Sequence, residues 1–130
     1  MNLKEHIHYI DSIQIELSEY KKDQFAKKYT ALLEALDFLQ TQIAPDKQDV
    51  DILGNRVIGY GYDVGYCPGI EDEFRILAKG LYTRLVDVIR HIYGMDSKDA
   101  IPYLEDLLTY ESGSDRYESI SKEIERLKNI

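Results

Sequence analysis

The chain has 130 residues, of which 44% are hydrophobic and 31% are charged. This composition fits one soluble globular domain over residues 1–130 with a core of its own, and it excludes an intrinsically disordered chain. The formal net charge of −8 argues against broad electrostatic binding to nucleic acid or anionic lipid. The acidity suits a protein that meets a basic partner, and the alternative, which we favour, is that it only serves solubility.

Three further features predict a cytoplasmic protein without a membrane segment. No apolar run approaches the length that crosses a bilayer. The first residues, MNLKEHIHYI, lack the apolar block and the cleavage site of a signal peptide. Cys67 is the only cysteine, so the chain cannot form an internal disulfide.

Two amphipathic stretches open the chain. Apolar residues recur at helical spacing over residues 3–20, although a strand-like alternation surrounds Ile15. A second helical stripe covers residues 24–43 and ends before Pro45. One continuous helix over both stretches is an alternative, but it would overhang a small domain, so we expect a hairpin or kink near Lys22.

The composition changes over residues 46–69, which contain five glycines. We expect a Gly/Tyr-rich loop here, or a small β-hairpin with Gly54-Asn55 as its two-residue turn. Long ordered loops often carry function. The alternative is a flap that only covers the open end of the bundle.

Residues 70–93 are predicted to form the central helix. Apolar residues recur in helical steps at Ile70, Phe74, Leu77, Leu81, Leu85, Val88 and Ile92. Further apolar residues widen this stripe to about half of the helix circumference, so the helix must be covered on more than one side. Acidic residues in its first turn and Gly94 just beyond its end match the preferences of helix termini.

The chain after Gly94 predicts a short helix that reaches Tyr110 and, beyond a turn, a last helix that begins near Ser114. The predicted fold is therefore mainly α. It is an antiparallel bundle of four to five helices around the central helix, with the Gly/Tyr loop or hairpin at one end.

No metal or cofactor site is expected. The single cysteine and the three histidines cannot build a zinc site at the usual spacings. Asp46, Asp49 and Asp51 lack the spacing of a calcium loop, and the glycine run matches neither phosphate-binding signature. Cys67 would need a nearby base to act as a nucleophile, and we favour a half-buried structural thiol.

Arg84, Asp87 and His91 share one edge of the central helix. In phosphodiester cleavage an arginine can stabilise the phosphorane charge while a histidine moves the proton. The segment RLVDVIRH satisfies the R-x4–6-H pattern of HEPN-type helical ribonucleases, which it resembles, and HIY is similar to the H-x-Y ending of one branch of that group, although Leu85 stands where a polar residue is usual. The resemblance implies a metal-independent ribonuclease that uses Arg84 and His91 in a cleft between two subunits. The alternative, which we favour, is an intrahelical surface ion pair beside a histidine at the core margin.

A non-enzymatic interaction protein is the function that these features favour. Such a protein would bind and restrain a protein partner, in the manner of an immunity protein, an antitoxin or a phage-encoded inhibitor. The chain contains eleven tyrosines and no tryptophan, and tyrosine is enriched at binding surfaces. Tyr60, Tyr62 and Tyr66 are the predicted contact residues, with Asp63 supplying charge. A further alternative is a structural scaffold module whose last helix, over residues 117–130, meets partner helices.

Overall fold

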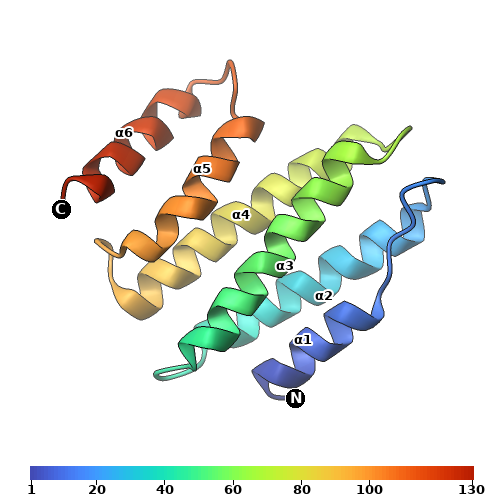
Figure 1. The fold of residues 1–130 in the computed structure, drawn as a ribbon, viewed down its shortest axis with the longest axis horizontal. Coiled ribbons are helices and arrows are strands. Elements are labelled where there is room, and N and C mark those ends of the chain that lie inside the picture. Colours follow the sequence, from blue (N-terminus) through green and yellow to red (C-terminus); the bar gives the residue numbers. More distant parts are fainter.

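The computed structural model describes residues 1–130 and contains six α-helices, one short 3₁₀ helix and no β-strand. The elements are α1 Leu3–Ser12, α2 Lys22–Gln40, α3 Lys47–Tyr66, α4 Asp72–Tyr93, the 3₁₀ helix η1 Lys98–Ala100, α5 Ile101–Tyr110 and α6 Arg116–Lys128. Consecutive α-helices run in opposite directions (Figure 1). The predicted packing of a mainly helical fold is confirmed, with six α-helices rather than four or five.

Helix α4 lies at the centre of the fold, as the sequence predicts. It packs against α2, α3 and α5 (Figure 1). Its buried side chains are Phe74, Ala78, Leu81, Tyr82, Leu85, Val86, Val88 and Ile89. Acidic residues occupy its first turn, and Gly94 ends it with a φ of 100° that favours glycine. Because α4 touches helices on several sides, its side chains reach both α3 and α5.

Residues 46–69 are the main correction to the predicted fold, because most of them form α3 rather than a loop or a β-hairpin. The Asp46 side chain caps this helix by accepting a hydrogen bond from the backbone N–H of Gln48 at 2.8 Å. Buried apolar residues then follow at helical spacing: Val50, Leu53, Val57, Tyr60 and Val64. Burial of this stripe outweighs the low helix propensity of the glycines, and Gly54-Asn55 lies within the helix instead of forming a turn.

A tight turn joins α3 to α4. The backbone N–H of Ile70 donates a hydrogen bond to the carbonyl of Cys67 at 3.4 Å, and Gly69 has a φ of 76°. Proline followed by a glycine with positive φ is typical of a type II turn. Pro68 and Gly69 therefore reverse the chain at this point, beside the buried free thiol of Cys67.

The N-terminal part contains two separate helices. Helix α1 ends at Ser12 and α2 begins at Lys22. The predicted break near Lys22 is therefore confirmed, and the alternative of one continuous helix over both stretches is wrong. The strand-like alternation around Ile15 lies in the connection between them, which forms no strand. None of the helices is both long and apolar enough to cross a membrane.

A buried carboxylate secures the turn between α5 and α6. Glu111 is only 1% exposed, and its Oε1 lies 2.8 Å from the Lys79 Nζ and 3.3 Å from an Arg116 guanidinium nitrogen. The Ser114 hydroxyl donates a hydrogen bond to the Glu111 Oε2 at 2.6 Å. Burial alone would raise the pKa of Glu111, but the contacts from Lys79 and Ser114 outweigh burial and hold that pKa below its usual value of 4.5.

Replacing Glu111 by glutamine is expected to lower the free energy of unfolding by about 1 to 2 kcal/mol at neutral pH, because charge-assisted contacts are lost. A carboxyl whose pKa is depressed on folding stabilises the protein above its unfolded pKa of 4.5 and loses this effect as the pH falls through the folded value. The difference between the two proteins should therefore shrink as the pH falls from neutral to below 4.5. Urea unfolding at neutral and at acidic pH measures the difference in the free energy of unfolding between the two proteins.

Glu118→Gln is the matched control for this experiment. Glu118 lies on α6 and forms only an exposed ion pair with Lys122. Its replacement should change the free energy of unfolding by less than about 0.5 kcal/mol. A Glu111 variant that behaves like this control at neutral pH would show that the buried carboxylate does not secure the turn.

Candidate functional site

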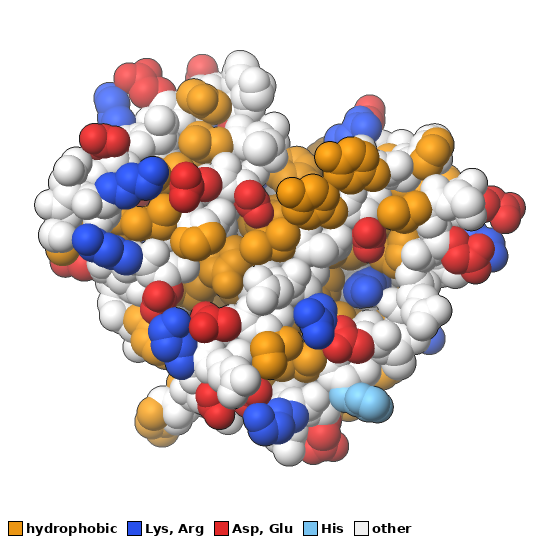
Figure 2. Space-filling view, in the orientation of Figure 1, with side chains coloured by type: hydrophobic (Ala, Val, Ile, Leu, Met, Phe, Trp, Pro, Cys, Tyr) orange, Lys and Arg blue, Asp and Glu red, His pale blue; other side chains and the backbone are white.

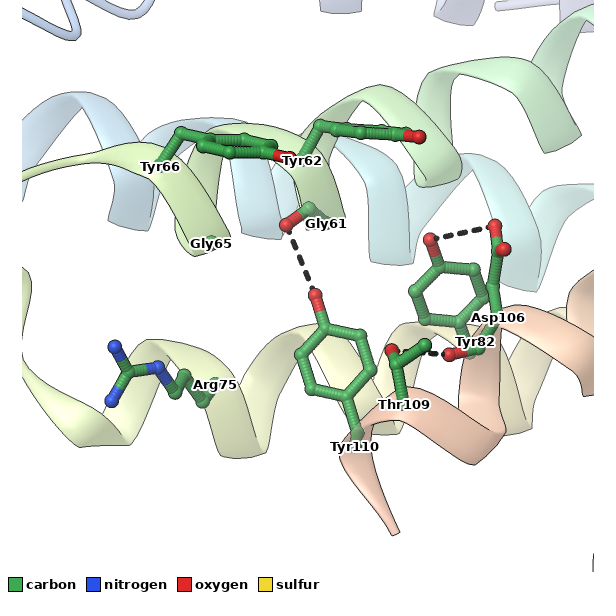
Figure 3. A pocket seen from close by; sticks show the side chains of 9 residues that line it. All are labelled: Gly61, Tyr62, Gly65, Tyr66, Arg75, Tyr82, Asp106, Thr109 and Tyr110. Carbon is green, nitrogen blue, oxygen red and sulfur yellow. Dashed lines mark hydrogen bonds between the residues drawn. The ribbon is translucent and has the colours of Figure 1, made fainter. Parts of the chain in front are cut away.

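A cleft with a volume of about 530 Å³ opens between α3, α4 and α5. Its lining residues are Gly61, Tyr62, Gly65, Tyr66, Arg75, Tyr82, Asp106, Thr109 and Tyr110 (Figure 3). Figure 2 shows a notch at the top of the molecule, on the side where α5 faces the end of α3, with hydrophobic side chains in and beside it. Four of the eleven tyrosines therefore gather at one concave site.

Two glycines of α3 form the floor of the cleft. A Cβ atom at Gly61 would lie 2.8 Å from the hydroxyl oxygen of Tyr82 and 3.0 Å from that of Tyr110, so only glycine allows both rings to approach. The Tyr110 hydroxyl donates a hydrogen bond to the Gly61 carbonyl at 3.0 Å. A Cβ atom at Gly65 would meet nothing within 4 Å, because this position faces the open cleft.

Tyr62 and Tyr66 stand on the rim of the cleft, one helical turn apart on α3 (Figure 3). The two residues are 60% and 71% exposed. The two rings are stacked, with their centroids 5.8 Å apart and their planes within 9° of parallel. Exposed, stiff aromatic rings beside a cleft are typical of binding surfaces, because they lose little conformational entropy when they are covered.

The polar groups of the cleft differ in how well they are paired. Arg75 donates a hydrogen bond to Asp72 at 2.7 Å and points away from Asp106 (Figure 3). Asp106 is half-buried, and its carboxylate accepts one hydrogen bond, of 3.3 Å, from the Tyr82 hydroxyl. The Thr109 hydroxyl bonds only the backbone carbonyl of Asp106 (Figure 3). Burial raises the pKa of Asp106, and the bond from Tyr82 offsets only part of this effect. The cleft thus holds a carboxylate without a cation and a guanidinium that already has a partner.

The predicted contact residues separate into two groups in the structure. Tyr62 and Tyr66 lie at the cleft, as described above. Tyr60 faces the opposite side of α3, where it is 1% exposed and donates a hydrogen bond from its hydroxyl to the Phe25 carbonyl at 3.0 Å. Asp63 is half-buried outside the cleft, and burial raises its pKa while Lys28 lowers it. Tyr60 is therefore a core residue, and the expectation that it is a contact residue does not fit its burial.

Three cleft residues had no signal in the sequence. Tyr82 lies in the apolar stripe of the central helix and Tyr110 at the end of the next one, and nothing in the sequence singles out Asp106. A clue was present in α3, since Gly61 and Gly65 are spaced one helical turn apart. Small residues at that spacing permit close approach of neighbouring side chains, but this interpretation requires that the segment be recognised as a helix.

Arg84 and His91 both lie on α4 but have separate surroundings. The Arg84 guanidinium donates hydrogen bonds to Asp37 at 3.1 and 3.2 Å and also contacts Gln40. His91 is exposed in the last turn of the helix, and no hydrogen bond joins it to Arg84. The ion pair of Arg84 thus joins α4 to α2 instead of lying within α4, and His91 is exposed rather than at the core margin, so both parts of the favoured alternative are wrong in detail. The ribonuclease interpretation stays a prediction.

The remaining acidic candidates have structural partners. Asp46 caps α3, Asp49 lies 2.9 Å from the Lys4 ammonium, and Asp51 lies 3.3 Å from that of Lys47. No group of three or more His, Cys, Asp or Glu side chains is arranged to hold a metal ion. Comparison with protein-family models, with curated proteins and with solved structures finds no significant match.

Proposed function

We propose that this chain is a non-enzymatic interaction protein that binds and restrains a protein partner through the cleft between α3 and α5. Proteins of this kind include immunity proteins, antitoxins and phage-encoded inhibitors. The observation that carries the proposal is the stacked, exposed pair Tyr62 and Tyr66 on the rim of the cleft. Two large rings that stay exposed beside a concave aromatic surface have the properties of binding hot spots.

The charge of the chain supports a basic partner. The formal net charge is −8, and the cleft carries the uncompensated carboxylate of Asp106. Complementary charge raises the rate of association and selects among partners. A protein partner with a basic surface therefore fits the site better than an acidic one.

The scaffold alternative has less support from the last helix. Three residues of its apolar stripe, Ile120, Ile124 and Leu127, are buried in the core of this chain. Tyr117 remains partly exposed. The stripe that was expected to meet partner helices is thus largely used within the fold.

Removal of the two rings tests the proposal. The variant with Tyr62→Ala and Tyr66→Ala is expected to bind the captured partner about 30-fold or more weakly, since hot-spot side chains contribute about 2 kcal/mol or more. Affinity capture from the native cell with mass spectrometry identifies the partner, and calorimetry with the purified partner measures the affinity. Tyr9→Ala on α1 is the control, because Tyr9 is also exposed but lies outside the cleft.

A steric test is independent of the tyrosines. Gly65→Leu places a side chain into the open cleft, whereas Gly59→Leu places the same side chain on an exposed part of α3 outside it. Both changes should favour the helix, and only Gly65→Leu should block the partner. Partner binding that survives both Gly65→Leu and the loss of Tyr62 and Tyr66 would show that the cleft is not the binding site.

A further inference from the structure

We infer that the cleft receives an arginine side chain of the basic partner, with its guanidinium against the tyrosine rings and paired to Asp106. This inference rests on the proposed function, and it goes further by assigning the chemistry of the group that enters. The cleft volume of about 530 Å³ accommodates an arginine together with the backbone that carries it.

Asp106 is the first part of the argument. Other shielded carboxylates of this protein have cations beside them: Glu111 has Lys79 and Arg116, and Glu123 has Arg90 at 2.7 Å. The Asp106 carboxylate forms no ion pair, and the only hydrogen bond that it accepts is the one of 3.3 Å from the Tyr82 hydroxyl. A half-buried carboxylate in this state gains from an incoming cation, because burial otherwise disfavours its charge.

The arrangement of the rings is the second part. Tyr62 and Tyr66 present nearly parallel rings on one side of the cleft, and Tyr110 stands on the other side (Figure 3). A cation is attracted to the face of an aromatic ring, and a planar guanidinium can also stack on it. The guanidinium can then donate two parallel hydrogen bonds to the two oxygens of a carboxylate. The ammonium of a lysine is a point charge and does not match this geometry as well.

Arg75 does not already supply this cation. Its guanidinium is bonded to Asp72 and is directed away from Asp106 (Figure 3). The pKa of Asp106 is shifted by burial, by the hydrogen bond from Tyr82 and by the negative charge of Glu105, and no cation contributes to this shift. The position beside Asp106 is therefore open to a positive charge from a partner.

The test uses three short peptides that differ in one side chain: acetyl-Gly-Arg-Gly-amide, its lysine counterpart and its neutral citrulline counterpart. Each is titrated into the full ¹⁵N-labelled chain, and the backbone amide signals of Gly61, Tyr62 and Gly65 are followed by NMR. The arginine peptide is expected to bind about tenfold more tightly than the citrulline peptide and several-fold more tightly than the lysine peptide. Asp106→Asn should lower the affinity for the arginine peptide about tenfold and leave the affinity for the citrulline peptide unchanged.

Matched variants and a competing ligand complete the experiment. Gly65→Leu should abolish the shifts, and Gly59→Leu should preserve them. A short oligouridine is titrated in parallel, since tyrosine rings can also stack with bases. Three results would each overturn the inference. They are shifts of the cleft amide signals with the oligouridine alone, equal affinity for the arginine and citrulline peptides, and no saturable shift of these signals with the arginine peptide.

The same variants separate this inference from the proposed function. A partner that is lost on replacement of Tyr62 and Tyr66 but retained by Asp106→Asn would leave the binding function standing and would refute arginine recognition. A partner that tolerates both the tyrosine replacements and Gly65→Leu would refute the binding function at this site, whatever the peptides do.

Discussion

Truncation of Phe25 to alanine is expected to lower the free energy of unfolding by about 3 to 5 kcal/mol. The Phe25 ring is fully buried and lies 5.6 Å from the ring of Phe74, 5.9 Å from Tyr20 and 6.1 Å from Tyr60. These rings belong to α2, α3, α4 and the segment before α2, so they join three helices at one point. Alanine would leave a cavity that the packed neighbours fill only in part.

Urea unfolding followed by circular dichroism measures this loss. The midpoint should fall while the slope with denaturant stays the same, which marks a change in stability alone. Tyr60→Phe, which removes only the hydrogen bond to the Phe25 carbonyl, is expected to cost about 1 kcal/mol. Tyr62→Ala removes an exposed ring and should change stability by less than about 0.5 kcal/mol. Equal losses for Phe25→Ala and Tyr62→Ala would contradict the assignment of core and rim.

Replacing Gly54 by alanine is expected to destabilise the protein by about 1 to 2 kcal/mol, which is an overpacking cost of about 2 to 3 kcal/mol less a gain in helix propensity of about 1 kcal/mol. A Cβ atom at this position would lie 1.9 Å from the hydroxyl oxygen of Tyr103 and 2.5 Å from its ring carbon Cζ. Tyr103 is itself buried on α5, so its ring cannot move aside without disturbing the core. The gain in helix propensity from glycine to alanine, about 1 kcal/mol, is smaller than this overpacking cost.

Gly59→Ala is the matched control for Gly54→Ala. Gly59 lies on the same helix, is exposed, and has open space where a Cβ atom would stand. Its replacement should raise the free energy of unfolding by up to about 1 kcal/mol. A double-mutant cycle with Tyr103→Leu should reduce the cost of Gly54→Ala, since the clashing ring is gone. Destabilisation of the same size at both glycines would indicate a general helix effect rather than a clash with Tyr103.

Much of the fold could be predicted because apolar periodicity is a local signal. The stripes of α2, α4 and α6 appear directly in the sequence, and so does the end of α4 at Gly94. The sequence does not predict helix α3, because its four glycines lower the helix propensity by about 1 kcal/mol each. The stripe from Val50 to Val64 carried the opposite signal, and its burial against α4 outweighs the cost of the glycines.

The candidate site could be predicted only in part for a different reason. The local pattern of tyrosines interleaved with glycines predicts Tyr62 and Tyr66 as contact residues, and both lie at the cleft. Its other wall depends on contacts between distant residues: Tyr82 bonds Asp106 across 24 positions, and Tyr110 bonds Gly61 across 49. Such pairings follow from the packing of α3, α4 and α5, which the sequence pattern does not specify.

The hydrogen bond from Tyr110 to the Gly61 carbonyl has a consequence for the thermodynamics of recognition. It joins the floor of the cleft on α3 directly to its wall on α5, and the second bond, from Tyr82 to Asp106, joins α4 to the same wall. The separation of the walls is thus set before any ligand arrives. A preorganised cleft loses little conformational entropy on binding, so the entropic cost of forming the complex falls mainly on the partner.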